Sequence, residues 1–127
     1  MTTEKEINLV YWRKGKCTLL RPLESTDTAV VYRGINRPDS NRYLADTSPK
    51  GFQYEEDWVK RVQLPNPNNL VLGICTPNNE LIGTIGLHQI DLVNGTAETG
   101  TVIYEERHRG KGYGTDAKMC ILEYAFN

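Results

Sequence analysis

The sequence predicts an α+β domain in which a mostly antiparallel sheet is flanked by helices. Short apolar and β-branched runs joined by tight turns occupy the middle of the chain, and segments with helical spacing lie before and after them. No repeat, low-complexity tract or linker divides the sequence. A chain of 127 residues is long enough for one hydrophobic core, so residues 1–127 are expected to form a single domain.

The first third of the chain predicts two short strands and a helix. Residues 7–12 alternate weakly between apolar and polar, and a turn at 14–15 separates them from a second strand over 17–21. Pro22 ends that strand. Several candidate N-cap residues then precede a helix predicted over 28–34.

A polar loop and a second helix follow. Residues 36–51 are polar and contain prolines, so they are predicted to form a loop with room for a short helix. Residues 54–62 carry apolar side chains at helical spacing, and the Pro-Asn-Pro run at 65–67 ends that helix.

The middle of the chain has the period of β-strands. Three apolar runs are expected to form an antiparallel meander, and they cover residues 70–75, 81–90 and 96–104. Residues 77–79 form the first turn, and Asn94-Gly95 is a strong signal for the second. Gly83 and Gly86 predict a bend or bulge in the second of these strands.

The most informative segment reads RHRGKGYGTD over residues 107–116, between the last strand and a helix that starts near Gly112. Glycines at alternate positions let the backbone turn tightly and approach a ligand. The helix start offers unpaired amides and a partial positive charge, to which Arg107, Arg109 and Lys111 add full charges. The segment is suited to a diphosphate, and the alternative is an ordinary turn with solvated basic residues.

Two common phosphate-binding patterns do not fit this segment. No register supplies the P-loop pattern, and Thr115 stands where the dinucleotide fingerprint needs its third glycine. The pattern Arg/Gln-x-x-Gly-x-Gly/Ala is matched by residues 109–114.

Residues 109–114 resemble the acetyl-CoA motif of the GNAT N-acetyltransferase family. Other segments are similar to its third strand, its fourth strand and the helix after its loop, namely residues 81–87, 97–104 and 115–127. Residues 20–23 and 36–44 resemble its ribosomal-protein N-terminal acetyltransferase (RimJ/RimL-like) branch. The resemblance covers nearly the whole chain. It implies the N-terminal portion of the acyl-CoA N-acyltransferase fold, with a mixed, mostly antiparallel sheet.

That resemblance implies an acetyl-CoA-dependent N-acetyltransferase. The amides of the loop would hold the pyrophosphate of coenzyme A, and the residues concerned are Arg109, Gly110, Lys111, Gly112, Tyr113, Gly114 and Thr115. Val102, Ile103 and Tyr104 would pair with the pantetheine arm. A bulge in this strand would expose the N–H of Val102 to the thioester carbonyl, in an oxyanion-stabilising role.

An amine acceptor is mostly protonated at neutral pH, so a base should assist the transfer. Glu98 and His88 are the candidates, and the alternatives are a solvated strand carboxylate and a rim histidine. In the family a tyrosine of the next helix often protonates the thiolate, and here that helix would lie beyond Asn127. The chain is therefore expected to lack the family's C-terminal strands and helix, or to rely on a second copy in a homodimer to cover its last helix. Truncation is favoured.

Arg42, Tyr43 and Trp58 are expected to line the acceptor pocket, with core packing of the aromatics and solvation of Arg42 as the alternatives. The branch resemblance favours a peptide α-amine, and relatives also acetylate small amines. A non-catalytic acyl-CoA-binding module is the main competing function, and a nucleotide-binding domain is a third.

Composition limits the other classes. A net charge of −1 without long basic runs argues against a nucleic-acid binder. No run approaches the roughly 20 apolar residues of a membrane span, and residues 1–6 lack the features of a secretion signal, so a cytoplasmic location is expected. The three widely spaced cysteines contain no Cys-x-x-Cys pair, so they are expected to be reduced core residues, with a catalytic thiol as the alternative, and no metal site is predicted.

Overall fold

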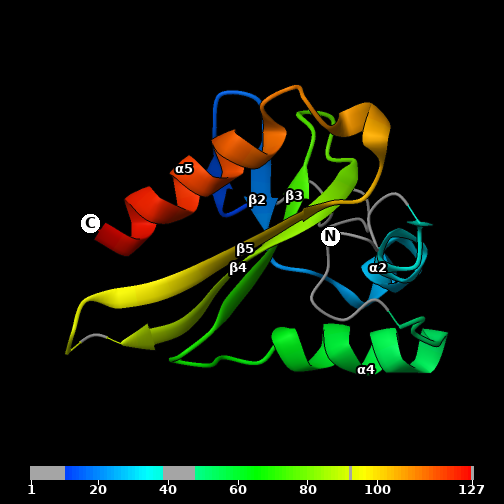
Figure 1. The fold of residues 1–127 in the computed structure, drawn as a ribbon, viewed down its shortest axis with the longest axis horizontal. Coiled ribbons are helices and arrows are strands. Elements are labelled where there is room, and N and C mark those ends of the chain that lie inside the picture. The colour runs from blue at the N-terminus through cyan, green and yellow to red at the C-terminus, as the bar shows by residue number, and fades with distance from the viewer. Residues whose placement is uncertain (1–10, 39–47, 92, 127) are drawn as a thin grey trace, which may run out of the picture.

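A five-stranded antiparallel sheet with the strand order β1-β2-β3-β4-β5 forms the centre of the molecule (Figure 1). The structure is a computed structural model that describes residues 11–38, 48–91 and 93–126. The strands are β1 (Arg13–Lys14), β2 (Leu19–Arg21), β3 (Leu70–Cys75), β4 (Leu81–Asp91) and β5 (Thr96–Ile103). The α-helices are α2 (Thr28–Ile35), α4 (Phe52–Val62) and α5 (Tyr113–Phe126), and the 3-10 turns are η1 (Ser25–Asp27) and η2 (Glu106–His108). The predicted fold class is confirmed.

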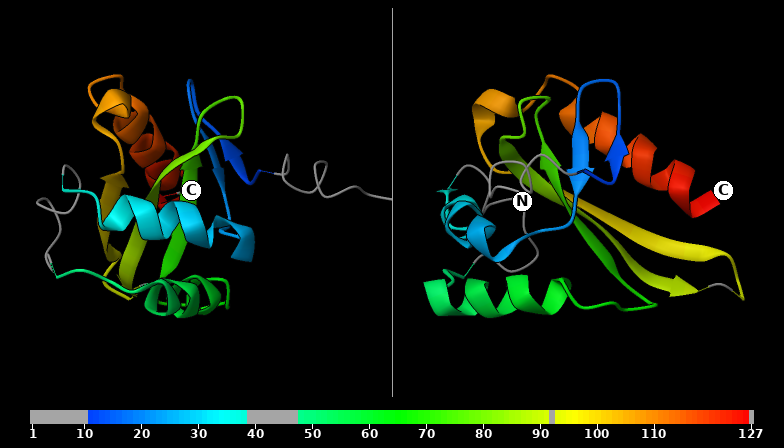
Figure 2. Two further views of the ribbon diagram at one scale, coloured as in Figure 1. Left: turned by 90° about the vertical axis from the view of Figure 1, so that its right-hand side faces the viewer. Right: turned by 180° about the vertical axis from the view of Figure 1, so that it is seen from behind.

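Alternation of side chains along the strands gives the sheet two apolar faces, each covered by different helices. On one face the cluster that includes Leu72, Ile74 and Ile85 packs against Ile121 of α5. On the other face Leu23 packs with residues of α2 and α4. Both views in Figure 2 place α2 and α4 together and away from α5.

A buried ion pair fixes the start of α2 against the sheet. Arg21 of β2 donates to both carboxylate oxygens of Asp27, at 2.7 and 2.9 Å. Asp27 also accepts the N–H of Glu24, at 2.7 Å, which caps η1. Because both charged groups are buried and each satisfies the other, the pair positions the helix relative to the strand.

The N-terminal hairpin differs from the prediction. The described end of the predicted 7–12 strand is not a strand, and β1 begins at Arg13. The N–H of Gly15 bonds to the carbonyl of Thr18, so the turn lies over 15–18 and β1 and β2 pair around it. The helices predicted over 28–34 and 54–62 are confirmed, and α4 starts two residues earlier, at Phe52.

The predicted meander of three antiparallel strands is confirmed, and its irregularities are only partly where the glycines indicated. One register shift lies between Ile74 and Cys75, opposite the Gly83 region. The other lies after His88, where Gln89 has a positive φ of 51°. Gly86 pairs regularly on both sides, so the register has no bulge at Gly86.

Among the helices that the structure describes, none is both long enough and apolar enough to cross a bilayer.

Candidate functional site

The glycine loop joins η2 to α5 and presents a run of unused backbone amides. Gly110 and Gly112 have φ of 72° and 84°, values that side chains with a Cβ rarely adopt. The N–H of Asp116 bonds to the carbonyl of Gly112, which sets the start of the helix. Within the described chain, the amides from Gly110 through Thr115 have no hydrogen-bond partner. They lie at the positive end of the helix dipole, so together they can accept an anion.

Arg109 connects this loop to the end of β5. Its guanidinium donates to the carbonyl of Ile103 at 2.7 Å and to that of Tyr104 at 3.4 Å. Its own N–H bonds to the carbonyl of Glu106 at 2.9 Å. The amides available to a ligand therefore begin at Gly110, one residue later than the sequence predicted. Arg109 positions the loop through its side chain.

Lys111 is exposed, and Tyr113 and Gly114 are half-buried at the start of α5. The ring of Tyr113 contacts that of His108 edge-on, with centroids 6.2 Å apart. A Cβ at Gly114 would lie 3.7 Å from the Thr101 side chain, which is ordinary contact. Helix and edge strand therefore pack closely at this point.

The ladder between β4 and β5 determines which amides of β5 face the open edge of the sheet. It runs without a register shift from Ile103 to Glu98. Tyr104 donates its N–H to a carbonyl of β4. Because hydrogen-bonding groups alternate in direction along a strand, those of Val102 also point to β4, and those of Thr101 and Ile103 point to the open edge. The Arg109 guanidinium on the carbonyl of Ile103 agrees with this direction.

The bulge expected at Val102 is absent from this ladder. A Cβ at Gly83 would overlap the carbonyl oxygen of Val102, so the backbone of Val102 is turned toward β4. The prediction that the N–H of Val102 faces a thioester is therefore corrected. Ile103 and Thr101 offer edge-facing amides in its place.

Tyr104 lies beyond the end of β5 and points into the interior beneath α2. Only 3% of it is exposed, and its ring occupies the space where a Cβ on Gly34 would stand. Its hydroxyl lacks a well-formed hydrogen bond, although Thr84 lies close enough to influence it. Burial raises the pKa of Tyr104 well above its usual range. Its side chain is thus a core group, whereas the sequence placed Tyr104 along the pantetheine arm.

The two candidate bases face each other across the ladder. His88 pairs with Glu98, so both side chains lie on the face covered by α2 and α4. Glu98 is exposed. The His88 ring lies over Gly86, where any Cβ would collide with it, and its Nδ1 lies 3.3 Å from the Oδ1 of Asn69.

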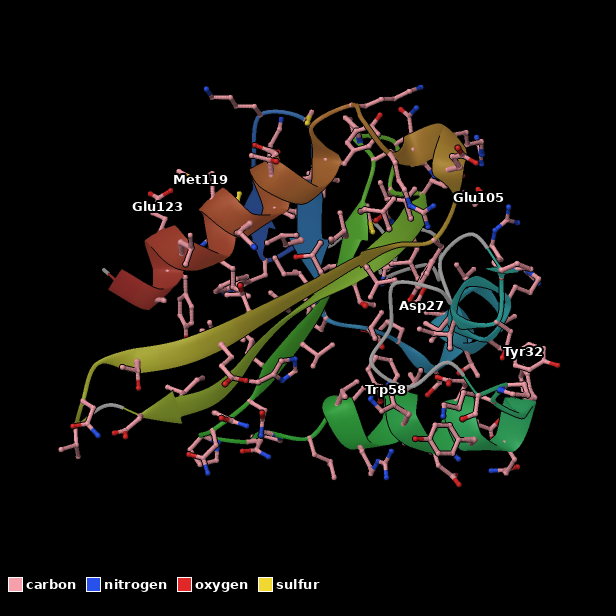
Figure 3. All side chains as sticks on the ribbon, in the orientation of Figure 1. Asp27, Tyr32, Trp58, Glu105, Met119 and Glu123 are labelled. Carbon is pink, nitrogen blue, oxygen red and sulfur yellow. The ribbon has the colours of Figure 1, made fainter. Side chains whose placement is uncertain are left out.

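A hollow of about 320 Å³ lies between α4, the segment after it and β4, and His88 lines it. Trp58, Arg61 and Val62 come from α4, and Asn66 and Asn69 complete the polar part of its wall. Figure 3 shows Trp58 on the side of α4 that faces the sheet. Trp58 packs on the second core, which was the alternative reading of this residue, and it also lines this hollow. Arg42 and Tyr43, the other predicted acceptor residues, lie outside the described residues.

Sequence reasoning missed Arg61, Asn66 and Asn69. Asn69 carried no signal, since an asparagine in a Pro/Asn-rich turn is typical of any loop. Its place beside His88 depends on a backbone contact, the N–H of Ile90 with the carbonyl of Asn68, which no local pattern predicts.

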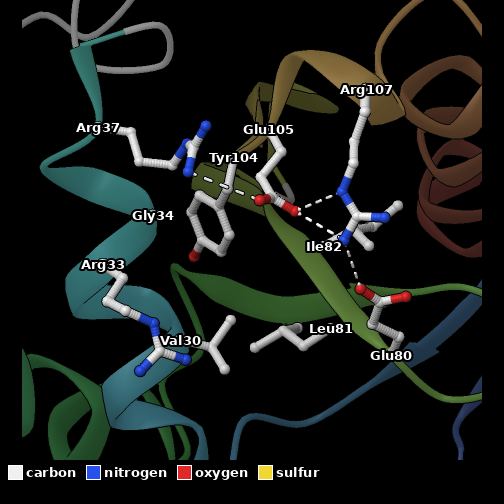
Figure 4. A pocket seen from close by; sticks show the side chains of 10 residues that line it. All are labelled: Val30, Arg33, Gly34, Arg37, Glu80, Leu81, Ile82, Tyr104, Glu105 and Arg107. Carbon is white, nitrogen blue, oxygen red and sulfur yellow. Dashed lines mark hydrogen bonds and ion pairs between the residues drawn. The ribbon is translucent and has the colours of Figure 1, made fainter.

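A second hollow of about 330 Å³ lies on the same face, between α2 and the ends of β4 and β5. Its floor is apolar, with Val30, Ile82 and Tyr104, and its rim carries charged side chains of both signs (Figure 4). Arg107 and Glu105 belong to that rim. Tyr104 is the one predicted site residue among those that line it.

The cysteines do not offer a nucleophile. Cys75 is buried, and this burial raises the pKa of its thiol to about 11. Burial also raises the pKa of Cys17 and Cys120, with the carboxylate of Asp116 adding to the effect. All three are free thiols and are protonated at neutral pH, but only Cys75 is fully buried as expected, whereas Cys17 and Cys120 are partly exposed.

Comparison with known proteins agrees with this arrangement. The sequence profile of the acetyltransferase (GNAT) domain matches residues 18–127. A probable N-acetyltransferase of Bacillus subtilis, YjcK, is 31% identical in an alignment 124 positions long that covers 90% of this chain and 67% of that protein. The uncharacterized N-acetyltransferase p20 of Bacillus licheniformis is 28% identical over 84% of this chain. The chain spans 61% of the length of p20.

Solved structures share the fold. The crystal structure of a probable acetyltransferase, 27% identical, superposes with a TM-score of 0.79 over 94% of this chain and 68% of that one. The microcin C7 self-immunity acetyltransferase MccE was solved in complex with acetyl-CoA and AMP, and it is 18% identical to this chain. It superposes with a TM-score of 0.74 over 86% of this chain and 62% of its own length, so the two share the fold. The profile match over residues 18–127, with the glycine loop at the head of α5, establishes that this chain belongs to the GNAT acetyltransferase family.

Proposed function

We propose that this chain is a GNAT domain that transfers an acetyl group from acetyl-CoA directly to a primary amine. The acceptor would be a peptide N-terminus or a small molecule. Residues 20–23 and 36–44, which resemble the RimJ/RimL-like branch, favour the peptide α-amine. The transfer needs no covalent enzyme intermediate, in keeping with three cysteines held as protonated thiols.

The observation that carries this proposal is the run of free amides from Gly110 through Thr115. A diphosphate would satisfy several of them at once, and each hydrogen bond to a charged acceptor contributes roughly 1.5–3 kcal/mol. Lys111 would add long-range attraction from solvent. Arg109 would act through its side chain, by holding the loop to β5.

The open edge of β5 would receive the pantetheine arm. Thr101 and Ile103 offer edge-facing amides, and an amide-containing arm pairs with such an edge as an added strand does. Val102 can donate to the thioester only if its pairing with Thr84 is released. We therefore assign the oxyanion-stabilising role to the edge-facing amides, with Ile103 nearer the loop.

Glu98 and His88 would accept the proton of the acceptor amine through a chain of ordered waters, because neither side chain can reach an amine that attacks a thioester held at Ile103. Glu98 lies roughly 16 Å along the strand from Ile103, at the rise of an extended chain. The hollow beside His88 and Trp58 would then hold the body of the acceptor. Its wall combines apolar and polar side chains, as small-molecule sites do.

Coenzyme A binding by a Gly112→Ala variant tests the proposal. Gly112 has a φ of 84° and no atom within 4 Å of an added Cβ, so the substitution strains the backbone without a steric clash. Moving the amides out of alignment should weaken coenzyme A binding at least about ten-fold, the loss of one hydrogen bond to an anion. Isothermal titration calorimetry measures the change.

Gly95→Ala is the matched control. Gly95 has a φ of 67° and the same empty surroundings, but it lies in the hairpin between β4 and β5. Both variants should lose similar stability, and only Gly112→Ala should lose coenzyme A. Equal coenzyme A affinity in the two variants would show that the glycine loop is not part of the coenzyme A site. Coenzyme A binding without acetylation of any amine in a panel would reassign the chain as an acyl-CoA-binding module.

A further inference from the structure

A cluster of three potential metal ligands lies at the entrance to the glycine loop. Glu80 precedes β4, Glu105 follows β5 and His108 ends η2. One oxygen of each carboxylate and one ring nitrogen of His108 all lie within 4.8 Å of one another. Groups of exposed acidic residues are common on protein surfaces without a metal ion. The burial and hydrogen bonding of His108 therefore decide whether this cluster is a candidate metal site.

His108 is an unsatisfied group aimed at this cluster. It is 7% exposed, and among the residues that the structure describes its buried Nδ1 has no hydrogen-bond partner. That nitrogen lies 3.8 Å from the Oε2 of Glu105, too far for a hydrogen bond. A buried polar atom left unpaired costs about 1–3 kcal/mol. A partner bound between the carboxylates and Nδ1 of His108 would remove this cost.

Arg107 shows that the space between the carboxylates accepts a cation. Its Nη2 lies 3.0 Å from the Oε1 of Glu80 and 2.9 Å from the Oε2 of Glu105 (Figure 4). Its side chain is 63% exposed, so it can move into solvent at little cost. In the described chain no hydrogen bond joins this guanidinium to Nδ1 of His108. A metal ion can take all three ligands.

We propose that Glu80, Glu105 and His108 bind a divalent transition-metal ion of the zinc class, which displaces the guanidinium of Arg107. One imidazole and two carboxylates form a ligand set that such ions accept in proteins. His108 stands two residues before Gly110, so a bound ion would hold the start of the loop. Because Arg107 competes for the same carboxylates, the affinity for the metal ion should be moderate, and removal of the Arg107 side chain should raise that affinity.

The test uses the full chain without an affinity tag and Co²⁺ as the probe. Calorimetry gives the affinity, and paramagnetic broadening of backbone amide signals in NMR gives the place. Broadening should centre on the three ligands. Glu80→Gln should weaken binding at least about ten-fold, because a ligand is lost. Glu80 is half-exposed, so this variant should remain folded.

Arg107→Gln supplies a result of opposite sign, a severalfold gain in Co²⁺ affinity, which general destabilisation would not produce. His88→Gln is the matched control, because His88 and His108 are the two histidines of the chain. It should leave the affinity unchanged. The proposal is overturned if Arg107→Gln fails to strengthen binding, if Glu80→Gln binds as the wild type does, or if broadening centres on His88 or a cysteine.

Discussion

At the scale of single residues, Asp116 links the N-terminal hairpin to the helix that carries the glycine loop. Its carboxylate accepts the amides of Lys16 and Cys17, both at 2.9 Å, and the hydroxyl of Thr18 at 2.7 Å. Gly15 has no room for a Cβ because this carboxylate fills the space. One side chain in the first turn of α5 thus holds a turn that is distant in sequence.

Asp116→Asn should destabilise the fold by about 1–3 kcal/mol, because an amide keeps one acceptor oxygen and sets a donor against another donor. Asp57→Asn is the control, since Asp57 is exposed on α4 and its carboxylate accepts a hydrogen bond from Gln53, its one partner within residues 11–38, 48–91 and 93–126. Its effect should stay within about 0.5 kcal/mol. Urea unfolding of the two variants measures both differences at neutral pH.

The same contacts predict a pH dependence. Partial desolvation opposes ionisation of Asp116, but the hydrogen bonds from Cys17, Thr18 and Lys16 prevail and lower its pKa from 3.8. A lowered pKa means that the stabilisation is present above the unfolded value and is lost as the pH falls below it. The stability difference between wild type and Asp116→Asn should therefore shrink below pH 3.8. A difference that stays constant across that range would contradict this account.

At the scale of elements, α2 approaches the end of β5 through a glycine. Gly34 is buried in the last turns of α2, and a Cβ there would overlap the ring of Tyr104. Helix propensity alone predicts that Gly34→Ala stabilises by up to about 1 kcal/mol. The overlap with a fully packed ring should outweigh this gain and destabilise by about 1–3 kcal/mol.

Gly100→Ala provides the contrast, because a Cβ at Gly100 in β5 would meet no atom within 4 Å. It should stabilise by about 0.5–1 kcal/mol, the entropic cost of a strand glycine. Thermal unfolding of both variants gives the two signs. A stabilised Gly34→Ala would show that α2 can move away from Tyr104.

Elements with local signals could be predicted from the sequence. The glycine loop has alternate glycines, neighbouring basic residues and a following helix, and all three signals lie within ten positions, so its bend could be predicted. The direction of the amides of β5 could not, because it depends on the register with β4. That register directs the backbone N–H and C=O of Val102 toward β4 and those of Ile103 toward the open edge of the sheet.

At the scale of the whole molecule, function depends on which distant segments the sheet brings together. The ladder pairs His88 with Glu98, and α4 adds Trp58, so three predicted residues occupy one region. The sequence contains no signal for this proximity, or for the grouping of Glu80 with His108. Both result from strand pairing between segments that follow different turns. Single residues could be nominated from the sequence, but their partners required the fold.

The sheet also separates the interior into two clusters that should respond independently to mutation. Leu23 belongs to the cluster under α2 and α4, whereas Ile121 and Leu72 belong to the cluster under α5. Leu23→Ala should cost about 2–5 kcal/mol and Ile121→Val about 0.5–1.5 kcal/mol. Since the backbone of the sheet lies between them, the double variant should equal the sum within about 0.5 kcal/mol.

Leu72→Ala replaces Leu23→Ala in the control pair, because it removes the same atoms from an equally buried leucine in the cluster that contains Ile121. Side chains around a shared cavity relax together, so this double variant should depart from additivity by more than about 0.5 kcal/mol. Urea unfolding of the single and double variants measures both coupling energies. Coupling between Leu23 and Ile121 as large as in the control pair would mean that the sheet transmits repacking from one face to the other. The glycine loop before α5 would then be sensitive to changes in the cluster under α2 and α4.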